Sequence, residues 1–308
     1  MRIFGRAVAF GAAILLAAAH GGLAQAPPDP IVKVDGLRRI SDHVHAIPDN
    51  SVPLVPNIGF VVGETGILVI DTGLGPRNGA AVAEVAQRLG GSRTLNLVTT
   101  HVHPEHDLGA QAFPATTQML RARAQQQDID EFGLQTADLF AARSAINADL
   151  LKGATFRKAD ITFDREYELD LGGVRARLVA MGANHTRGDT IVWVEQDRVL
   201  FSGDIAMRAQ PAFASAYSRL DHWLESLDRL DALNPAIVVP SHGPVGDAAF
   251  IAGYRTYLTR VRDRVTAAKR DGQSVDKTVE AVTGELAGQY PDRARLGGAV
   301  RATYGAVP

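Results

Sequence analysis

The chain has 308 residues, of which 46% are hydrophobic, a formal net charge of −2 and no cysteine. This length suits one large domain or two small ones. The lack of cysteine excludes a disulfide framework, a thiolate nucleophile and a thiolate metal ligand. Lys and Arg are not clustered, so the sequence predicts no nucleic-acid partner.

The first 26 residues have the pattern of a secretory signal peptide. Arg2 and Arg6 form a positively charged start, residues 7–19 form an apolar run, and "AQA" at residues 24–26 fits a cleavage site. The run is shorter than the roughly 20 residues of a membrane span, although an uncleaved N-terminal anchor is the alternative. We therefore predict a periplasmic or secreted protein with no stable membrane anchor after cleavage, and one domain over residues 27–308.

Strand patterns begin after residue 57. Residues 58–63 ("IGFVVG") and 66–71 ("GILVID") are rich in β-branched residues and predict a hairpin. Residues 78–90 carry Ala, Val and Leu at helical spacing, which predicts a helix with Asn78 as its N-cap and Gly90 as its end.

Another short strand is predicted over residues 95–100, and it leads directly into His101. The residues that follow it therefore lie on a loop at a strand end, where functional side chains are commonly placed. The Ala- and Gln-rich stretch 119–151 predicts helix.

The rest of the chain repeats the order of strands followed by helix. A hairpin is predicted at Gly172-Gly173 and another at Gln196-Asp197, and helical patterns cover residues 221–233 and the segment from about residue 247. Residues 236–243 ("AIVVPSHG") read as a buried strand that ends at a histidine. This order predicts an α/β fold with two sheets packed face to face and helices outside.

The segment "THVHPEHD", residues 100–107, concentrates three histidines and two carboxylates. His101 and His103 are separated by one residue, so in an extended segment both side chains point the same way and can hold one ion. Glu105 and His106 follow and can turn toward a neighbouring ion. We take Asp107 instead as a cap of the following helix.

Three further candidate ligands follow short β-type runs: His185, Asp204 and His242. Imidazole and carboxylate groups suit Zn²⁺, with bonds of about 2.0–2.2 Å. Seven such ligands exceed one tetrahedral zinc and fit two zinc ions that share a carboxylate. Taken singly, each also has an ordinary interpretation. His185 could be a polar surface or core residue, Asp204 could cap a helix, and His242 could lie in a turn.

Three other histidines, His43, His45 and His222, do not share this strand-end pattern. We interpret them as ordinary polar residues outside the site.

The segment "THVHPEHDLGA" resembles the H-x-H-x-D-H signature of the metallo-β-lactamase superfamily. "ILVIDTG", "NHTRGDTIVW", "VLFSGD" and "VPSHG" resemble further motifs of that family in the same order, so the resemblance spans residues 58–243. It implies an αββα sandwich with a metal site at one edge between the two sheets.

The resemblance also implies which side chains hold the two zinc ions. By this resemblance, His101, His103 and His185 bind the first ion. Glu105, His106 and His242 bind the second ion, and Asp204 bridges the two. Asp71 matches a position that orients the ligand loop.

Glu105 departs from the family, which usually has Asp there. Its extra methylene extends the carboxylate by about 1.5 Å, which is large against a metal-ligand tolerance near 0.2 Å, so the second zinc is expected to bind more weakly. Asp204 replaces the cysteine of one group of β-lactamases. Residues 57–73 ("NIGFVVGETGILVIDTG") and 256–276 ("TYLTRVRDRVTAAKRDGQSVD") look most similar to the exported branch associated with quinoprotein relay and sulfur oxidation.

These features predict an exported dinuclear zinc hydrolase that acts on a small-molecule ester, lactone, thioester or lactam through a metal-bound hydroxide. Glu105 would orient the hydroxide or take its proton. Three alternatives remain: a β-lactamase as the main activity, an iron-dependent oxidoreductase of the same fold, and a non-catalytic metal-binding protein. Against the di-iron branch, this chain has His103 where that branch has Glu.

Overall fold

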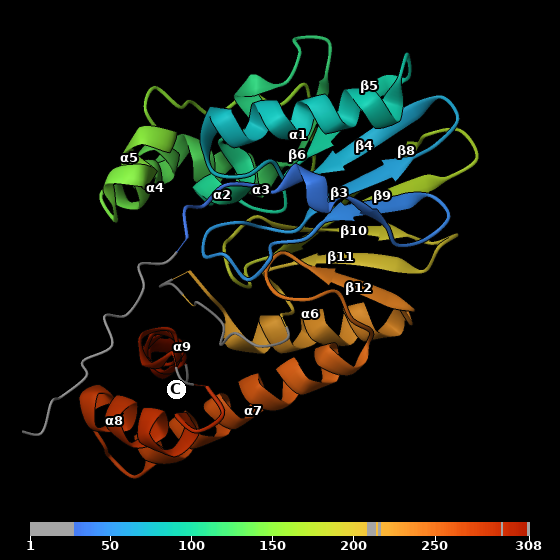
Figure 1. Cartoon of the computed structure of the whole chain (residues 1–308). Coiled ribbons are helices and arrows are strands. Elements are labelled where there is room, and N and C mark those ends of the chain that lie inside the picture. The colour runs from blue at the N-terminus through green and yellow to red at the C-terminus, as the bar shows by residue number, and fades with distance from the viewer. Residues whose placement is uncertain (1–27, 208–213, 215–216, 291, 307–308) are drawn as a thin grey trace, which may run out of the picture.

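The computed structural model describes residues 28–207, 214, 217–290 and 292–306. The predicted signal peptide and its cleavage site therefore lie outside the described residues. Two mixed sheets pack face to face, and helices cover the outer face of each sheet (Figure 1). The predicted αββα arrangement is thus confirmed.

The first sheet holds seven strands in the order of the chain. They are β1 (Arg38–Arg39), β2 (Val44–Ile47), β3 (Ile58–Val62), β4 (Gly66–Ile70), β5 (Thr94–Val98), β6 (Gln118–Ala122) and β7 (Ile161–Phe163). Strands β1 to β4 are antiparallel, whereas β4 to β7 are parallel. Every residue of β4 is buried, because a strand covered on both faces needs apolar side chains throughout. The predicted hairpin of β3 and β4 is confirmed, with Val61 opposite Leu68.

The second sheet has five strands in the order β12-β11-β10-β9-β8. They are β8 (Glu166–Asp170), β9 (Arg175–Gly182), β10 (Asp189–Val194), β11 (Val199–Gly203) and β12 (Ile237–Pro240). Only β11 and β12 run parallel. The hairpins predicted at Gly172-Gly173 and at Gln196-Asp197 are both confirmed.

The two sheets share one apolar core. Its buried members include Val61, Leu68, Ile70 and Val98 from the first sheet and Leu178, Val192, Val199 and Phe201 from the second. Gly59 on β3 faces this core, and a Cβ there would lie 2.3 Å from a ring carbon of Phe201. Only glycine therefore lets the aromatic ring approach the first sheet so closely.

Helix α1 (Gly75–Gly90) covers the outer face of the first sheet through Val82, Val85 and Ala86. It begins three residues earlier than predicted, and Asn78 is not its N-cap. Pro76 occupies the first turn, where a missing N–H costs nothing. The buried Asn78 amide instead donates to the carbonyls of Pro30 and Leu74, and its oxygen accepts from Val32 N. The predicted end at Gly90 is confirmed.

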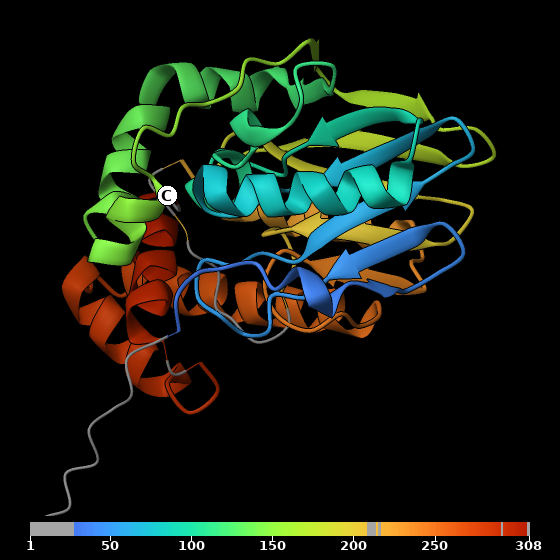
Figure 2. The same ribbon diagram turned by 45° about the horizontal axis from the view of Figure 1, so that its top comes forward.

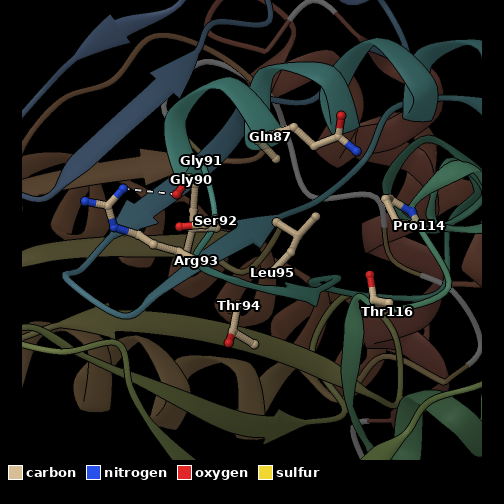
Figure 3. A pocket seen from close by; sticks show the side chains of 11 residues that line it. Gln87, Gly90, Gly91, Ser92, Arg93, Thr94, Leu95, Pro114 and Thr116 are labelled. Atoms are coloured by element: carbon tan, nitrogen blue, oxygen red, sulfur yellow. Dashed lines mark hydrogen bonds between the residues drawn. The ribbon is translucent and has the colours of Figure 1, made fainter.

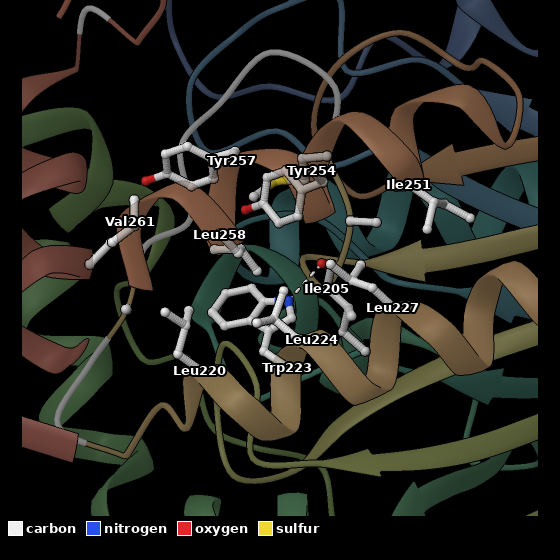
Figure 4. Packing of buried hydrophobic residues seen from close by; sticks show 14 of the residues in the cluster. Ile205, Leu220, Trp223, Leu224, Leu227, Ile251, Tyr254, Tyr257, Leu258 and Val261 are labelled. Atoms are coloured by element: carbon white, nitrogen blue, oxygen red, sulfur yellow. Dashed lines mark hydrogen bonds between the residues drawn. The ribbon is translucent and has the colours of Figure 1, made fainter. Parts of the chain in front are cut away.

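Helices α6 (Leu220–Ala232) and α7 (Ala249–Arg270) cover the outer face of the second sheet. Helices α8 (Val275–Leu286) and α9 (Arg293–Ala306) pack against α7 beyond the end of that face (Figure 1). Trp223 is fully buried between α6 and α7, and its Nε1 donates to the carbonyl of Ile205 at 2.8 Å (Figure 4). Among the described residues, no helix has both the length and the apolarity needed to cross a bilayer.

The prediction of helix over residues 119–151 is wrong at its start. Residues Gln118–Ala122 form β6, because pairing with β5 and β7 outweighs a helical preference of a few tenths of a kcal/mol per residue. The helices that follow are α3 (Arg123–Asp128), the π-helix η3 (Ile129–Gly133), α4 (Leu134–Ala141) and α5 (Ala145–Leu150). Figures 1 and 2 both place α4 and α9 at the same end of the sheets.

The remaining short elements lie on connections. They are η1 (Val34–Gly36), α2 (Pro104–Asp107) and η2 (Ala110–Ala112). Helix α2 matters most for the site, because it carries two of the candidate ligands.

Candidate functional site

All seven candidate ligands come together at one end of the two sheets. They are His101, His103, Glu105, His106, His185, Asp204 and His242, and all except the half-buried His103 are buried. Strand β5 leads to the loop and to α2, β11 to Asp204, and β12 to His242. The carboxyl ends of neighbouring parallel strands meet at the same edge of a sheet, and the sequence pattern predicted that these residues follow such strand ends.

The ligand atoms form three overlapping groups, each with its members within 4.8 Å of one another. The groups are His101 with His103 and His185, then His101 with His106 and Asp204, then Glu105 with His106 and His242. The first and third reproduce the two predicted sets. The second joins Asp204 to one histidine of each set, as a bridging carboxylate requires. The binding of metal by these residues stays a prediction.

The first group fits a cation. His103 Nδ1 lies 3.1 Å from His101 Nε2 and 3.1 Å from His185 Nε2. A proton shared between two ring nitrogens forms a hydrogen bond in only one of these two pairs, whereas a cation among the three nitrogens can be bound by all of them. Burial lowers the pKa of His101 and of His103 well below the usual range, and neighbouring imidazoles lower it further. Both rings are therefore neutral, which is the form that binds metal.

The other two groups also fit a cation. Glu105 Oε2, His106 Nε2 and Asp204 Oδ1 are buried, and none has a hydrogen-bond partner in the described part of the chain. Each such atom costs about 1–3 kcal/mol if it stays unsatisfied. Burial alone would raise the pKa of Asp204, but His185, His242 and His106 hold it well below its usual range. Asp204 is therefore an ionised carboxylate.

Asp71 orients one of the rings. Its carboxylate accepts from Thr100 N at 2.7 Å and lies 2.9 Å from His106 Nδ1. Burial opposes protonation of His106, but the charge and hydrogen bond of Asp71 raise its pKa to about 9 overall. Because Nδ1 is turned to Asp71, Nε2 faces the cluster. Asp71 has a φ of 64°, a strained backbone that is typical of functional sites.

Asp189 fixes the loop of His185, and it was not predicted as a site residue. Its carboxylate accepts from His185 N at 2.6 Å and Thr186 N at 3.0 Å, and also from the Thr186 hydroxyl. Burial raises the pKa of Asp189 to about 8 despite these bonds. The spacing of Asp189 four residues after His185 in "HTRGD" was the available signal.

Asp107 is not a helix cap, contrary to prediction. It is the last residue of α2 and is fully buried, and both of its oxygens lie 2.9 Å from Arg121 Nη2. Thr99 Oγ1 donates to Asp107 at 2.6 Å, and Gln125 Nε2 lies at 3.2 Å. A buried carboxylate needs such partners. The network anchors the histidine-bearing loop to β6.

We expect Arg121→Met to lower the free energy of unfolding by about 3–5 kcal/mol, because Asp107 would stay buried without its charge partner. Burial already raises the pKa of Asp107 and Arg121 opposes that rise. Loss of Arg121 raises the pKa further, so protonation relieves the variant as pH falls. Urea unfolding should show a larger loss near pH 8 than near pH 5. An equal loss at both pH values would contradict the role of the Asp107 charge.

Within residues 28–306 as described, His43, His45 and His222 lie outside the cluster, as expected. His43 Nδ1 is 2.7 Å from Asp197 Oδ1, and His222 Nε2 is 2.7 Å from the carbonyl of Met181. His45 belongs to β2 and is opposite Phe60 on β3.

A pocket of about 550 Å³ opens onto the cluster. Its floor includes His103, Glu105, His185 and Asp204, and its walls come mainly from η3, α4 and the start of α9. A second cavity of about 580 Å³ lies beside the end of α1, between Gln87, Arg93 and Thr116 (Figure 3). No histidine or carboxylate belongs to its described lining, so it offers no comparable chemistry.

Solved structures support the fold. The stereoselective inverting sec-alkylsulfatase of a Pseudomonas species matches with a TM-score of 0.70 at 15% identity, over 87% of this chain and 49% of that chain. The present chain thus spans about half the length of that enzyme. A metallo-beta-lactamase from Pontibacter korlensis matches with a TM-score of 0.56 at 22% identity, over 72% of this chain and 98% of that one.

Curated proteins with similar sequences carry metallo-beta-lactamase or beta-lactamase-like names. A metallo-beta-lactamase type 2 of Bacillus sp. (strain 170) is 22% identical over 204 residues, which cover 64% of this chain and 70% of the relative. A beta-lactamase-like protein 2 homolog of Caenorhabditis elegans is 30% identical over 84 residues, 27% of each chain. The family profile described as the metallo-beta-lactamase superfamily matches residues 52–242. With the ligand cluster inside that range, the chain belongs to the metallo-beta-lactamase superfamily.

Proposed function

We propose that this protein is a dinuclear zinc hydrolase that cleaves a small ester, lactone or thioester. The observation that carries the proposal is the set of three overlapping ligand groups on the floor of one pocket. Membership in the superfamily supports hydrolysis as the reaction class. The donor set of imidazoles and carboxylates, without thiolate, suits zinc.

His101, His103 and His185 would hold one ion, Glu105, His106 and His242 the other, and Asp204 both. When bound, such a pair of ions lowers the pKa of a coordinated water to about 7 and polarises the substrate carbonyl. The chain itself supplies the rigid frame. Asp71, Asp189 and the backbone carbonyl of Val55, which lies 3.1 Å from His242 Nδ1, fix the orientations of the rings and their loops.

Glu105 is the residue that we assign to proton transfer. Its Oε2 atom is buried and faces no described hydrogen-bond partner, while its Oε1 atom lies 3.9 Å from His106 Nε2. The carboxylate oxygen of Glu105 that does not hold the ion can accept a proton from a water molecule on the pocket floor. Val102 and Phe140 line the same pocket and limit the access of bulk water.

The proposal is tested with zinc-loaded and chelator-treated protein of residues 27–308, the proposed mature chain. The substrates are an aryl ester, a lactone, a thioester and a β-lactam. We expect zinc-dependent turnover of at least one of the first three. For the β-lactam we expect a specificity constant below the usual enzyme range of about 10⁴–10⁸ M⁻¹s⁻¹.

Three results would contradict the proposal. Turnover that survives complete metal removal would exclude the zinc mechanism. Hydrolysis that follows iron content rather than zinc content would exclude zinc as the metal. If the β-lactam alone is cleaved in the usual range, β-lactamase activity becomes the main function.

A further inference from the structure

The wall of the pocket above the candidate ligands is apolar. Phe132 comes from the π-helix η3, Leu139 and Phe140 come from α4, and all three line the pocket. Tyr217 stacks on Phe132, with ring centroids 5.5 Å apart and planes 6° apart. Leu139 is 62% exposed and Phe132 is half-buried, whereas Phe140 is 5% exposed. The wall therefore offers unburied apolar surface to a ligand mainly through Leu139 and Phe132.

Two arginines line the same pocket. Arg143 follows α4 and lies 3.6 Å above the ring centroid of Phe140, and within the described residues no carboxylate forms an ion pair with it. Arg295 lies on α9, opposite α4. Its Nε lies 3.5 Å from Asp292 Oδ2, while its Nη1 is buried and has no hydrogen-bond partner in the part of the chain that the structure describes.

The pocket has three carboxylates, but they have other partners. Glu105 and Asp204 belong to the ligand groups. Asp292 accepts from the backbone N of Arg295 at 3.0 Å, at the start of α9, and also faces the Arg295 side chain. Once divalent ions occupy the ligand groups, the two guanidinium groups leave the pocket with surplus positive charge. A negatively charged ligand group is therefore favoured.

We propose that the substrate is an amphiphilic carboxylic acid ester: its scissile carbonyl lies at the ligand cluster, its apolar chain lies along Phe132, Leu139 and Phe140, and a separate anionic end binds Arg295 and Arg143. This inference rests on the proposed function and narrows its substrate class. The guanidinium fork matches the two oxygens of a carboxylate. Arg295 is the stronger determinant, because its Nη1, buried and without a hydrogen-bond partner among the described residues, gains a first partner when the side chain turns toward the ligand.

Arg295 lies beyond residues 52–242, the range that matches the superfamily. The anion-binding group is therefore contributed by the C-terminal helices of this chain, which pack on the second sheet and reach the pocket with the first turn of α9. Figure 2 shows α9 and the α4 segment at the same end of the molecule.

The test compares two matched substrates, para-nitrophenyl hydrogen suberate and its methyl ester, which have a carboxylate and a neutral ester at the far end, and it follows only the release of para-nitrophenolate. With zinc-loaded protein we expect kcat/KM to favour the acid by about tenfold or more. Arg295→Met should reduce that preference by about tenfold, mainly through KM. Arg293→Met is the control, since Arg293 lies on the same helix and does not line the pocket. Equal losses for both substrates in Arg295→Met would overturn the inference.

A second arm tests the apolar wall. Along the series from hydrogen adipate to hydrogen sebacate, each buried methylene should raise kcat/KM by up to about fourfold. Leu139→Ser should flatten this dependence, because the serine removes exposed apolar surface without opening the core. A chain-length dependence that Leu139→Ser leaves unchanged would remove α4 from the binding wall.

Binding separates this inference from the proposed hydrolysis. Octanoate and octanamide have no ester bond, so calorimetric titration of the zinc-loaded protein measures recognition alone. We expect octanoate to bind more tightly than octanamide, and Arg295→Met should reduce the ratio of the two dissociation constants by about tenfold. If no ester is hydrolysed but Arg295→Met still reduces this difference, the proposed function fails and anion recognition by Arg295 stands. If esters are hydrolysed but octanoate binds no more tightly than octanamide, the proposed hydrolysis stands and only the proposed substrate class is wrong.

Discussion

Replacement of His103 by alanine is expected to remove at least one zinc ion per chain and to lower turnover by more than about 100-fold. The His103 Nδ1 atom lies 3.1 Å from a nitrogen of His101 and 3.1 Å from a nitrogen of His185. Its loss leaves only two imidazoles in the first group. Even residues that merely orient ligands cost about 10–100-fold in affinity or activity when mutated, so a direct ligand should cost more.

The measurement is metal content by mass spectrometry of the purified variant, beside its turnover of the best ester substrate. His45→Ala is the matched control, since His45 lies on β2 outside all three ligand groups. His103 is only half-buried, so its alanine variant should retain the circular dichroism of the native fold. A variant with the native zinc content and ordinary turnover would refute the assignment of the first group.

Local patterns predicted most of the fold. The hairpins of β3 with β4 and of β10 with β11 follow from β-branched runs separated by short polar turns. Strand β6 was missed because its residues, "QMLRA", prefer helix locally. Only its position between two parallel partners, far away in sequence, makes it a strand, and that position leaves no mark in the local pattern.

The same limit applies to the site. Histidines and carboxylates at strand ends could be found because spacing and strand position are local properties. The Asp107–Arg121 pair could not, since it depends on the missed strand β6. Likewise, Arg143 and Arg295 reach one pocket from distant helices, and neither stands in a recognisable motif. Residues that act through long-range packing therefore became visible only in the structure.

The longer carboxylate at position 105 should weaken the second zinc site without abolishing it. Glu105 is buried on α2, and its group with His106 and His242 lies within 4.8 Å, so the side chain does reach the cluster. A glutamate has one more rotatable bond to restrict than an aspartate, and ordering it costs more conformational entropy. We therefore expect chelator titration to remove one zinc ion from the native protein before the other.

Glu105→Asp and Glu105→Ala should separate the effect of side-chain length from the effect of the carboxylate itself. Glu105→Asp keeps the charge and the donor type, so it should keep most of the activity, or raise it if the loop moves toward the metal. Glu105→Ala removes both the oxygen ligand and the proposed proton acceptor. It should lose the second zinc selectively and lower turnover by about 100-fold or more, as for other polar groups that act in the transition state.

The decisive measurement is zinc stoichiometry under titrated chelator, beside turnover, for native protein, Glu105→Asp and Glu105→Ala. Two tightly bound zinc ions and ordinary turnover in Glu105→Ala would show that Glu105 is neither ligand nor base. Asp107, the nearest other carboxylate in sequence, is an unsuitable substitute. Arg121 contacts both of its oxygens at 2.9 Å and Thr99 donates to one of them, so a metal would have to break a fully buried ion pair to recruit it. Because that rupture costs about 3–5 kcal/mol, the loss of Glu105 should not be compensated from within the loop.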